Sequence, residues 1–139
     1  MDFDNSGFTL IELIIVLAII AIIGAILIPN FLNTTDRARL RSDIQSARVL
    51  QNALELHNTE QPVPITGSDI ASVISELDKK GYVDAKRVAV QTNGAVLQLG
   101  PEGKVQLNIS GANSENIQNT LYNQLSEQER QFVTGGKGA

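Results

Sequence analysis

One continuous apolar segment dominates the first quarter of the chain. No side chain from Leu13 to Ile28 is polar, and only Thr9, Glu12 and Asn30 interrupt the apolar pattern over 8–32. A helix of about 25 residues is roughly 37 Å long, which exceeds the roughly 30 Å hydrocarbon core of a bilayer. Because a lone segment in lipid must pair its backbone groups internally, the pattern predicts a membrane-spanning helix over 8–32.

An amphipathic helix pattern follows from Asp36 to His57. Apolar residues recur there at steps of three and four, which places them on one face, and a weaker stripe lies on roughly the opposite side. Two stripes indicate a helix that contacts its own domain and another molecule; alternatively, the second stripe is chance, because such residues are common on helix surfaces. The helix should end before Pro62. The first stripe is Leu40, Ile44, Ala47, Leu50 and Leu54, and the second is Val49, Ala53 and Leu56.

The rest of the chain predicts a small domain, so that 33–139 holds the amphipathic half of the helix and this domain. We expect a helix capped by Ser68, a hairpin turn at Asn93-Gly94, and a last helix over 114–133 that restarts at a Ser126–Glu129 capping box. The predicted strands are Val88–Val90, Val96–Leu99 and Val105–Ile109, and the apolar face of the capped helix is Ile70, Val73, Ile74 and Leu77. The long helix can cover one face of this short antiparallel sheet, so the predicted fold class is α+β with additional helices.

The composition excludes several kinds of site. The chain has no Cys, hence no disulfide, no thiolate metal site and no Cys nucleophile. Its one histidine, His57, is expected at an exposed helix end. A net charge of −4, few aromatics and no basic block argue against a nucleic-acid partner. We therefore predict no catalytic residue, no cofactor and no metal site, and a solvated face for the acids between Asp69 and Asp84.

One acidic residue stands out within the apolar segment. Glu12 is the only ionisable side chain between Asn5 and Thr35. A carboxylate left in lipid costs on the order of a few kcal/mol. Glu12 therefore either lies in the headgroup zone, near the positive helix N-terminus, or receives a partner cation on assembly.

Basic residues follow the apolar segment closely. Arg37, Arg39 and Arg41 alternate there, with Asp43 next. They form either a solvated collar that contacts anionic lipid headgroups or salt bridges between subunits. A simple positive-inside count, which also includes Arg48, favours a cytoplasmic location for the domain.

The stretch Gly-Phe-Thr-Leu-Ile-Glu-Leu, from Gly7 to Leu13, resembles the class III signal of type IV pilins and pseudopilins. The match extends through Pro29 and covers about residues 7 to 31. It implies a type IV pilin-like fold and a leader over 1–7 that prepilin peptidase removes by cutting between Gly7 and Phe8. It also implies methylation of the new amine of Phe8 and pairing of Glu12 with the Phe8 ammonium of a neighbouring subunit.

The same resemblance assigns a role to the lower end of the apolar helix. It implies that the helix melts locally between Gly24 and Pro29 when subunits pack into a filament. The alternative, from the residues themselves, is a tolerated kink, since proline removes one backbone hydrogen bond.

Three functions remain open at this stage. The resemblance implies first a type IV pilin, which is stored in the cytoplasmic membrane with its domain outside. Such a pilin polymerises with itself into an extracellular helical filament with the help of an assembly platform protein and its ATPase, for adhesion, motility or DNA uptake. The alternatives are a major pseudopilin of a type II secretion or competence system and a membrane-anchored binding domain that never polymerises. A cleaved secretory signal peptide is disfavoured, because the leader has no basic residue and the apolar segment is too long.

Overall fold

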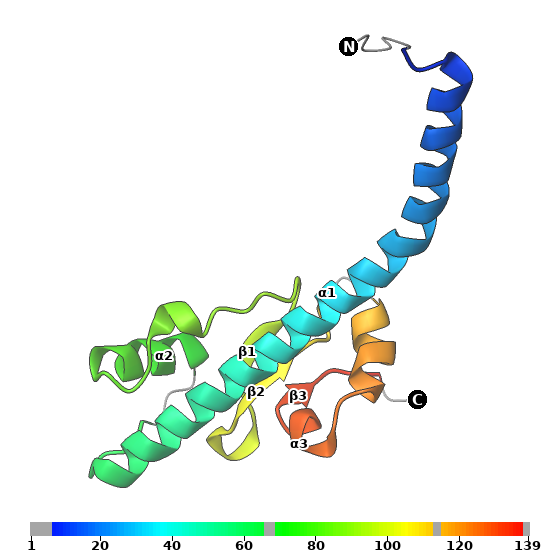
Figure 1. The fold of residues 1–139 in the computed structure, drawn as a ribbon. Coiled ribbons are helices and arrows are strands. Elements are labelled where there is room, and N and C mark those ends of the chain that lie inside the picture. The colour runs from blue at the N-terminus through cyan, green and yellow to red at the C-terminus, as the bar shows by residue number, and fades with distance from the viewer. Residues whose placement is uncertain (1–6, 66–68, 113–114, 138–139) are drawn as a thin grey trace. The chain divides into compact units, whose positions relative to one another are not determined.

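A computed structural model describes residues 7–65, 69–112 and 115–137 of the chain (Figure 1). Its internal contacts divide the chain into two units, Met1–Thr35 and Asp36–Ala139, and each is described by itself. Of the leader expected over 1–7, only Gly7 lies within the described residues, and the expected cap Ser68 lies outside them.

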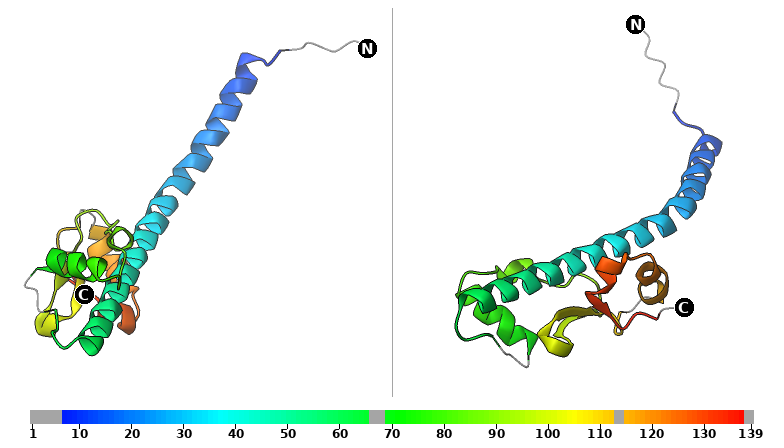
Figure 2. Two further views of the ribbon diagram at one scale, coloured as in Figure 1. Left: turned by 90° about the vertical axis from the view of Figure 1, so that its left-hand side faces the viewer. Right: turned by 90° about the horizontal axis from the view of Figure 1, so that it is seen from below.

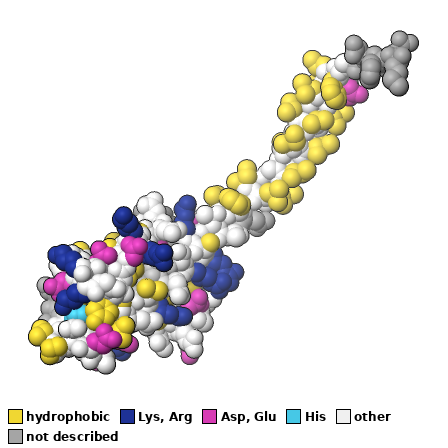
Figure 3. All heavy atoms as spheres, turned by 60° about the vertical axis from the view of Figure 1, so that its left-hand side comes forward, with side chains coloured by type: hydrophobic (Ala, Val, Ile, Leu, Met, Phe, Trp, Pro, Cys, Tyr) yellow, Lys and Arg dark blue, Asp and Glu magenta, His cyan; other side chains and the backbone are white. Residues whose placement is uncertain are grey.

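The first unit consists of the N-terminal part of helix α1 (Leu10–Glu60) and the three described residues before it. The large apolar side chains from Leu10 to Leu32 are all exposed, and Figure 3 shows them on the surface of this part of the helix. Within the described residues, α1 is the one helix long and apolar enough to span a membrane. So much exposed apolar surface requires a cover, which lipid or other subunits can supply.

In the second unit, the 36–60 part of α1 packs against the small domain. The first predicted stripe is confirmed, because Leu40, Ile44, Ala47, Leu50 and Leu54 are buried, and α1 ends before Pro62 as expected. The second stripe is only partly as predicted. Ala53 is buried beside the first stripe, since it lies three residues after Leu50, whereas Val49 and Leu56 are 42% and 51% exposed.

Helix α2 (Ile70–Lys79) is confirmed with its apolar face inward. Val73 and Leu77 are buried, and Ile70 and Ile74 pack against the core. The turn after α2 is closed by Gly81, whose φ of 79° favours glycine.

The sheet has three strands in the order β1-β2-β3: β1 (Val96–Leu99), β2 (Val105–Asn108) and β3 (Val133–Thr134). The predicted strands at 96–99 and 105–109 are confirmed as the antiparallel pair β1–β2, although β2 ends at Asn108. The turn between them contains the short helix η2 (Pro101–Gly103), and Leu97 pairs with Leu107. Strand β3 runs parallel to β2, so the sheet is mixed rather than purely antiparallel. Figure 2 shows the 36–60 part of α1 running across this sheet.

The prediction of a strand over Val88–Val90 is wrong. A short helix, η1 (Ala85–Arg87), precedes irregular chain there, and Asn93-Gly94 forms a turn closed by a 3.1 Å bond from Ala95 N–H to the carbonyl of Thr92. Val88 and Val90 lie in a loop that packs against the core, not in a strand. The carboxylate of Asp43 in α1 accepts the N–H groups of Gln91 and Thr92, which follow them.

The C-terminal segment is also more broken than predicted. It contains η3 (Asn116–Leu121, a π-helix), α3 (Glu127–Arg130) and then β3, in place of one helix over 114–133. The Ser126–Glu129 capping box that starts α3 is confirmed. The apolar side chains of the C-terminal segment pack into the same core, with Ile117, Leu121 and Leu125 buried. The fold is therefore α+β, as expected, with a third strand from the end of the chain.

Candidate processing and assembly site

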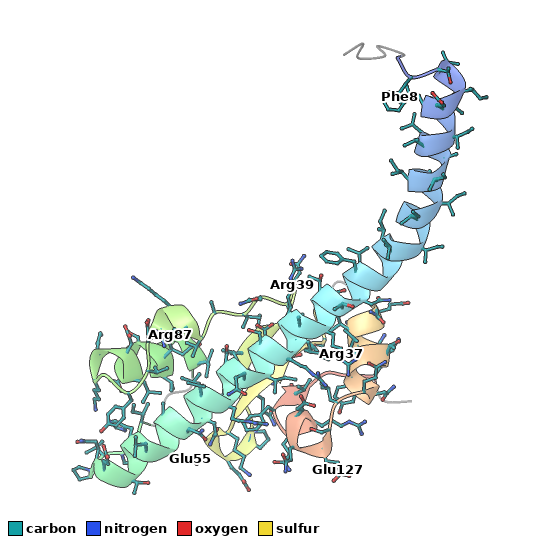
Figure 4. All side chains as sticks on the ribbon, in the orientation of Figure 1. Phe8, Arg37, Arg39, Glu55, Arg87 and Glu127 are labelled. Carbon is teal, nitrogen blue, oxygen red and sulfur yellow. The ribbon has the colours of Figure 1, made fainter. Side chains whose placement is uncertain are left out.

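Four residues at the start of α1 line one hollow of about 300 Å³: Gly7, Phe8, Thr9 and Glu12. The three predicted residues among them are thus brought together, and Figure 4 shows Phe8 beside the first turn of α1. The Phe8 side chain is 91% exposed. The peptide bond between Gly7 and Phe8 precedes α1, where no helical hydrogen bond holds the chain.

Thr9 and Glu12 exchange two hydrogen bonds. The Thr9 N–H donates to Oε2 of Glu12 at 2.8 Å, and the Glu12 N–H donates to Oγ1 of Thr9 at 3.3 Å. This is the capping box that satisfies two of the free N–H groups at a helix start. Sequence reasoning missed Thr9 as a partner, although a threonine three residues before a glutamate ahead of an apolar segment is the signal for this box.

The capping box leaves part of the Glu12 carboxylate available. Within the described residues, Oε2 accepts the Thr9 bond while Oε1 has no hydrogen-bond partner, and the side chain is exposed. The helix N-terminus supplies a favourable partial positive charge of about half an elementary charge. The carboxylate can therefore accept a further donor, and a cation is the donor that offsets its full charge.

Gly24 and Pro29 are not part of this hollow. Both lie farther along α1, and the backbone is helical at both positions. A Cβ atom added to Gly24 meets nothing within 4 Å. The two residues therefore lie in a regular part of α1, and their expected role concerns a state other than this one.

His57, expected at an exposed helix end, is instead fully buried in the second unit. Its Nε2 lies 2.9 Å from Nζ of Lys80, and the ring of Tyr82 meets it edge-on at 5.2 Å. The Tyr82 hydroxyl donates to Glu60 at 2.7 Å, and this bond raises the pKa of Tyr82 above 10.0. The turn after α2 brings Lys80 and Tyr82 back to α1, which no local pattern reveals.

Asp43 is also buried rather than part of a solvated collar. Its two oxygens accept the N–H groups of Gln91 at 2.8 Å and Thr92 at 2.7 Å. Asp43 is thus a structural residue that holds the loop after η1. The other acids behave as predicted, since Asp69, Glu76, Asp78 and Asp84 are exposed.

A further hollow, of about 360 Å³, lies in the second unit. It is open and is lined by Gln51, Glu55, Lys104, Val105, Gln106, Gln131 and Phe132. Among the described residues, no group of three or more acidic, His or Cys side chains is placed to hold a metal ion.

A comparison with known protein families matches the N-terminal segment of the chain. Residues 3–28 match the family model described as the prokaryotic N-terminal methylation motif. The prepilin peptidase-dependent protein A of Clostridium perfringens is 33% identical over 94 residues, which are 68% of this chain and 64% of that protein. The type IV major pilin protein PilE1 of Neisseria gonorrhoeae is 36% identical over 118 residues, 83% of this chain and 59% of that protein.

A third relative comes from a secretion system. The type II secretion system core protein G of Escherichia coli is 24% identical over 124 residues, 80% of this chain and 84% of that protein. No solved structure matches the chain significantly.

The chain thus carries the N-terminal methylation motif, and its relatives include a prepilin peptidase-dependent protein, a type IV major pilin and a type II secretion core protein. The chain spans 64% and 59% of the length of the first two relatives named above, so it is the shorter partner in both comparisons.

Proposed function

We propose that this chain is a type IV pilin precursor. Prepilin peptidase hydrolyses the peptide bond between Gly7 and Phe8 and then methylates the new amine of Phe8. The observation that carries the proposal is the hollow in which Gly7 and Phe8 adjoin the partly unpaired carboxylate of Glu12. The cleavage point and the charge that needs a cation thus line the same hollow.

Assembly follows from the electrostatics of Glu12. Among the described residues, its carboxylate has only the Thr9 N–H and the helix N-terminus as partners. In the filament, the Phe8 ammonium of a neighbouring copy becomes a full counter-charge. Once the pair is buried, removing one partner leaves an uncompensated charge that costs about 3–5 kcal/mol, which disfavours loss of a subunit from the filament.

The membrane supplies the second part of the proposal. The apolar side chains of 8–32 are covered by lipid before assembly and by other copies of the chain afterwards. The precursor is then a single-pass protein of the cytoplasmic membrane with its domain outside, and the product is an extracellular filament. An assembly platform protein and its ATPase would supply the work of extraction.

Gly24 and Pro29 would adapt the helix to the filament. Glycine has the weakest helix preference after proline, and proline has no amide hydrogen, so the stretch between them is the easiest part of α1 to melt. Melting exposes backbone groups that lipid cannot satisfy, so it belongs to the assembled state.

A pseudopilin of a type II secretion system is the second candidate. The match to the secretion core protein G favours it, because the aligned region is 84% of that protein. The processing and assembly chemistry of both candidates is the same, and they differ in the length and place of the filament. Electron microscopy of material sheared from intact cells separates long surface pili from a short periplasmic filament.

Mass spectrometry of the chain from membranes tests processing. We expect a chain that begins at Phe8 and carries one added methyl group. Gly7→Ala is the informative variant, because a Cβ atom at Gly7 meets nothing within 4 Å, so a loss of cleavage reports on the peptidase and not on the fold. Gly24→Ala is the control and should be processed normally, because a Cβ atom at Gly24 also meets nothing within 4 Å and its backbone is helical. A wild-type chain that retains Met1 in peptidase-containing cells would overturn the proposal.

A further inference from the structure

The arginines of the second unit fall into two groups. Four are engaged: Arg41 pairs with Glu129 at 3.6 Å, Arg48 lies 5.5 Å over the Phe132 ring, Arg87 pairs with Asp84 at 3.7 Å, and Arg130 donates to the carbonyl of Asn123 at 2.8 Å. The other two, Arg37 and Arg39, are exposed and have no ion pair, hydrogen bond or ring contact among the described residues.

The two unengaged arginines are also the two closest to the apolar segment. They follow Leu32 by five and seven residues. At a rise of about 1.5 Å per residue, their Cα atoms come roughly 8 and 11 Å later along α1. The headgroup zone on each side of a bilayer is about 5–8 Å thick, and an arginine side chain extends far enough to bridge the remaining distance.

Their placement around α1 also matters. Residues two apart on an α-helix point in directions about 200° apart, so Arg37 and Arg39 lie on opposite sides of the helix (Figure 4). A single protein partner contacts one side of a helix. Lipid headgroups surround a helix that emerges from a bilayer, so they can meet both side chains at once.

The local charge favours an anionic partner. Asp36 is the only acidic residue between Glu12 and Asp43, and both oxygens of Asp43 are occupied by backbone N–H groups. Arginine presents a planar pair of donors that matches a phosphate group. A phosphodiester with net negative charge is therefore the chemistry that fits these two side chains.

We infer that Arg37 and Arg39 form a collar that binds anionic phospholipid headgroups while the chain is stored in the membrane. This collar rests on the proposed membrane span of 8–32, but not on polymerisation. It holds the start of the second unit at the membrane surface, and subunits must release these headgroups when they enter a filament.

Native mass spectrometry of the full chain tests the collar. The purified protein is released from detergent micelles that contain equal amounts of phosphatidylglycerol and phosphatidylcholine, and the bound lipids are counted. The wild type should retain phosphatidylglycerol preferentially. The double variant Arg37→Gln/Arg39→Gln should lower the preference about fivefold for each arginine, and roughly 25-fold for both.

The double variant Lys79→Gln/Lys86→Gln is the matched control, because it removes the same charge from two exposed lysines. Lys79 is far from the collar. It adjoins Lys80, which contacts His57, and His57 lies about 30 Å along α1 from Arg37. This control should keep the wild-type lipid preference. An equal loss in both double variants would show a response to net charge only and would overturn the collar.

Two further outcomes decide between partners. If Arg37→Gln/Arg39→Gln keeps the lipid preference but loses filaments, the arginines bind carboxylates of neighbouring copies and the lipid collar is wrong. Carbonate extraction of membranes separates the collar from the proposed function. A chain removed by carbonate contradicts the membrane span itself, whereas a chain that resists carbonate and lacks lipid preference contradicts only the collar.

Discussion

The backbone N–H of Thr92 donates a 2.7 Å hydrogen bond to Oδ2 of Asp43, a buried carboxylate 49 residues earlier in the chain. The neighbouring N–H of Gln91 donates to Oδ1 of the same side chain at 2.8 Å. These two bonds explain why 88–92 is a loop against α1. The N–H groups of Gln91 and Thr92 already bind Asp43, so they are not available to pair with β1 in a hairpin.

Replacing Asp43 should therefore destabilise the second unit strongly. Asp43→Ala leaves two N–H groups without their acceptors, and each unsatisfied buried donor costs about 1–3 kcal/mol. We expect the free energy of unfolding to fall by about 3 kcal/mol in urea titrations. Asp69→Asn is the control, because Asp69 is exposed and its side chain makes no capping bond, so its effect should stay within about 0.5 kcal/mol. Equal stability of the two variants would contradict this role.

The capping box of α3 should make stability depend on pH. The Ser126 N–H donates to the Glu129 carboxylate at 2.9 Å, and this bond is the main cause that lowers the pKa of Glu129 below 4.5. A carboxyl whose pKa is lower in the folded state stabilises the fold above its unfolded pKa, and this stabilisation is lost as the pH falls through the folded pKa. The stability advantage of wild type over Glu129→Gln should thus be full at about pH 6 and should shrink below about pH 4. An advantage that does not change with pH would refute the charge-based account.

Lys80 should matter more than its exposed position suggests. Its ammonium is 2.9 Å from Nε2 of the buried His57, and an ammonium can only donate. Lys80→Met leaves that ring nitrogen without its donor, which should cost about 1–3 kcal/mol in thermal or urea unfolding. The neighbouring Lys79→Met should cost less than about 0.5 kcal/mol, because Lys79 is exposed. If the two methionine variants unfold alike, the contact with His57 contributes nothing.

Two substitutions at Glu12 separate its two roles. Glu12→Gln keeps an oxygen that can accept the Thr9 N–H but removes the charge, whereas Glu12→Ala removes both. If pairing with the Phe8 ammonium drives assembly, both variants should remain in the membrane and lose most of their filaments, measured as sheared pilin per cell. Thr9→Val, which removes only the hydroxyl of the capping box, should weaken the helix start by about 1 kcal/mol and retain filaments. Normal filaments from Glu12→Gln would show that capping, not charge, is what assembly requires.

Elements with a strong local signal were predictable. The apolar segment, the first stripe of α1, the face of α2 and the β1–β2 hairpin each follow from a period or a turn pattern within a few residues. The capping box at Ser126 belongs to the same group. The Thr9–Glu12 box has an equally local signal, a threonine three residues before a glutamate.

What the sequence determined by itself is the long helix of the first unit, since a lone apolar segment can span a membrane only as a helix. The sequence alone also shows that Glu12 is the only ionisable side chain between Asn5 and Thr35. The tertiary structure alone decided the partners that come from distant parts of the chain. Asp43 and His57 look like surface residues of an amphipathic helix, yet one receives the loop at Thr92 and the other receives Lys80. β3 pairs parallel with β2, far from it in sequence, where local propensity suggested the end of a helix. Such pairings depend on which buried donors and acceptors remain unsatisfied after the whole domain has packed, and no window of neighbouring residues contains that information.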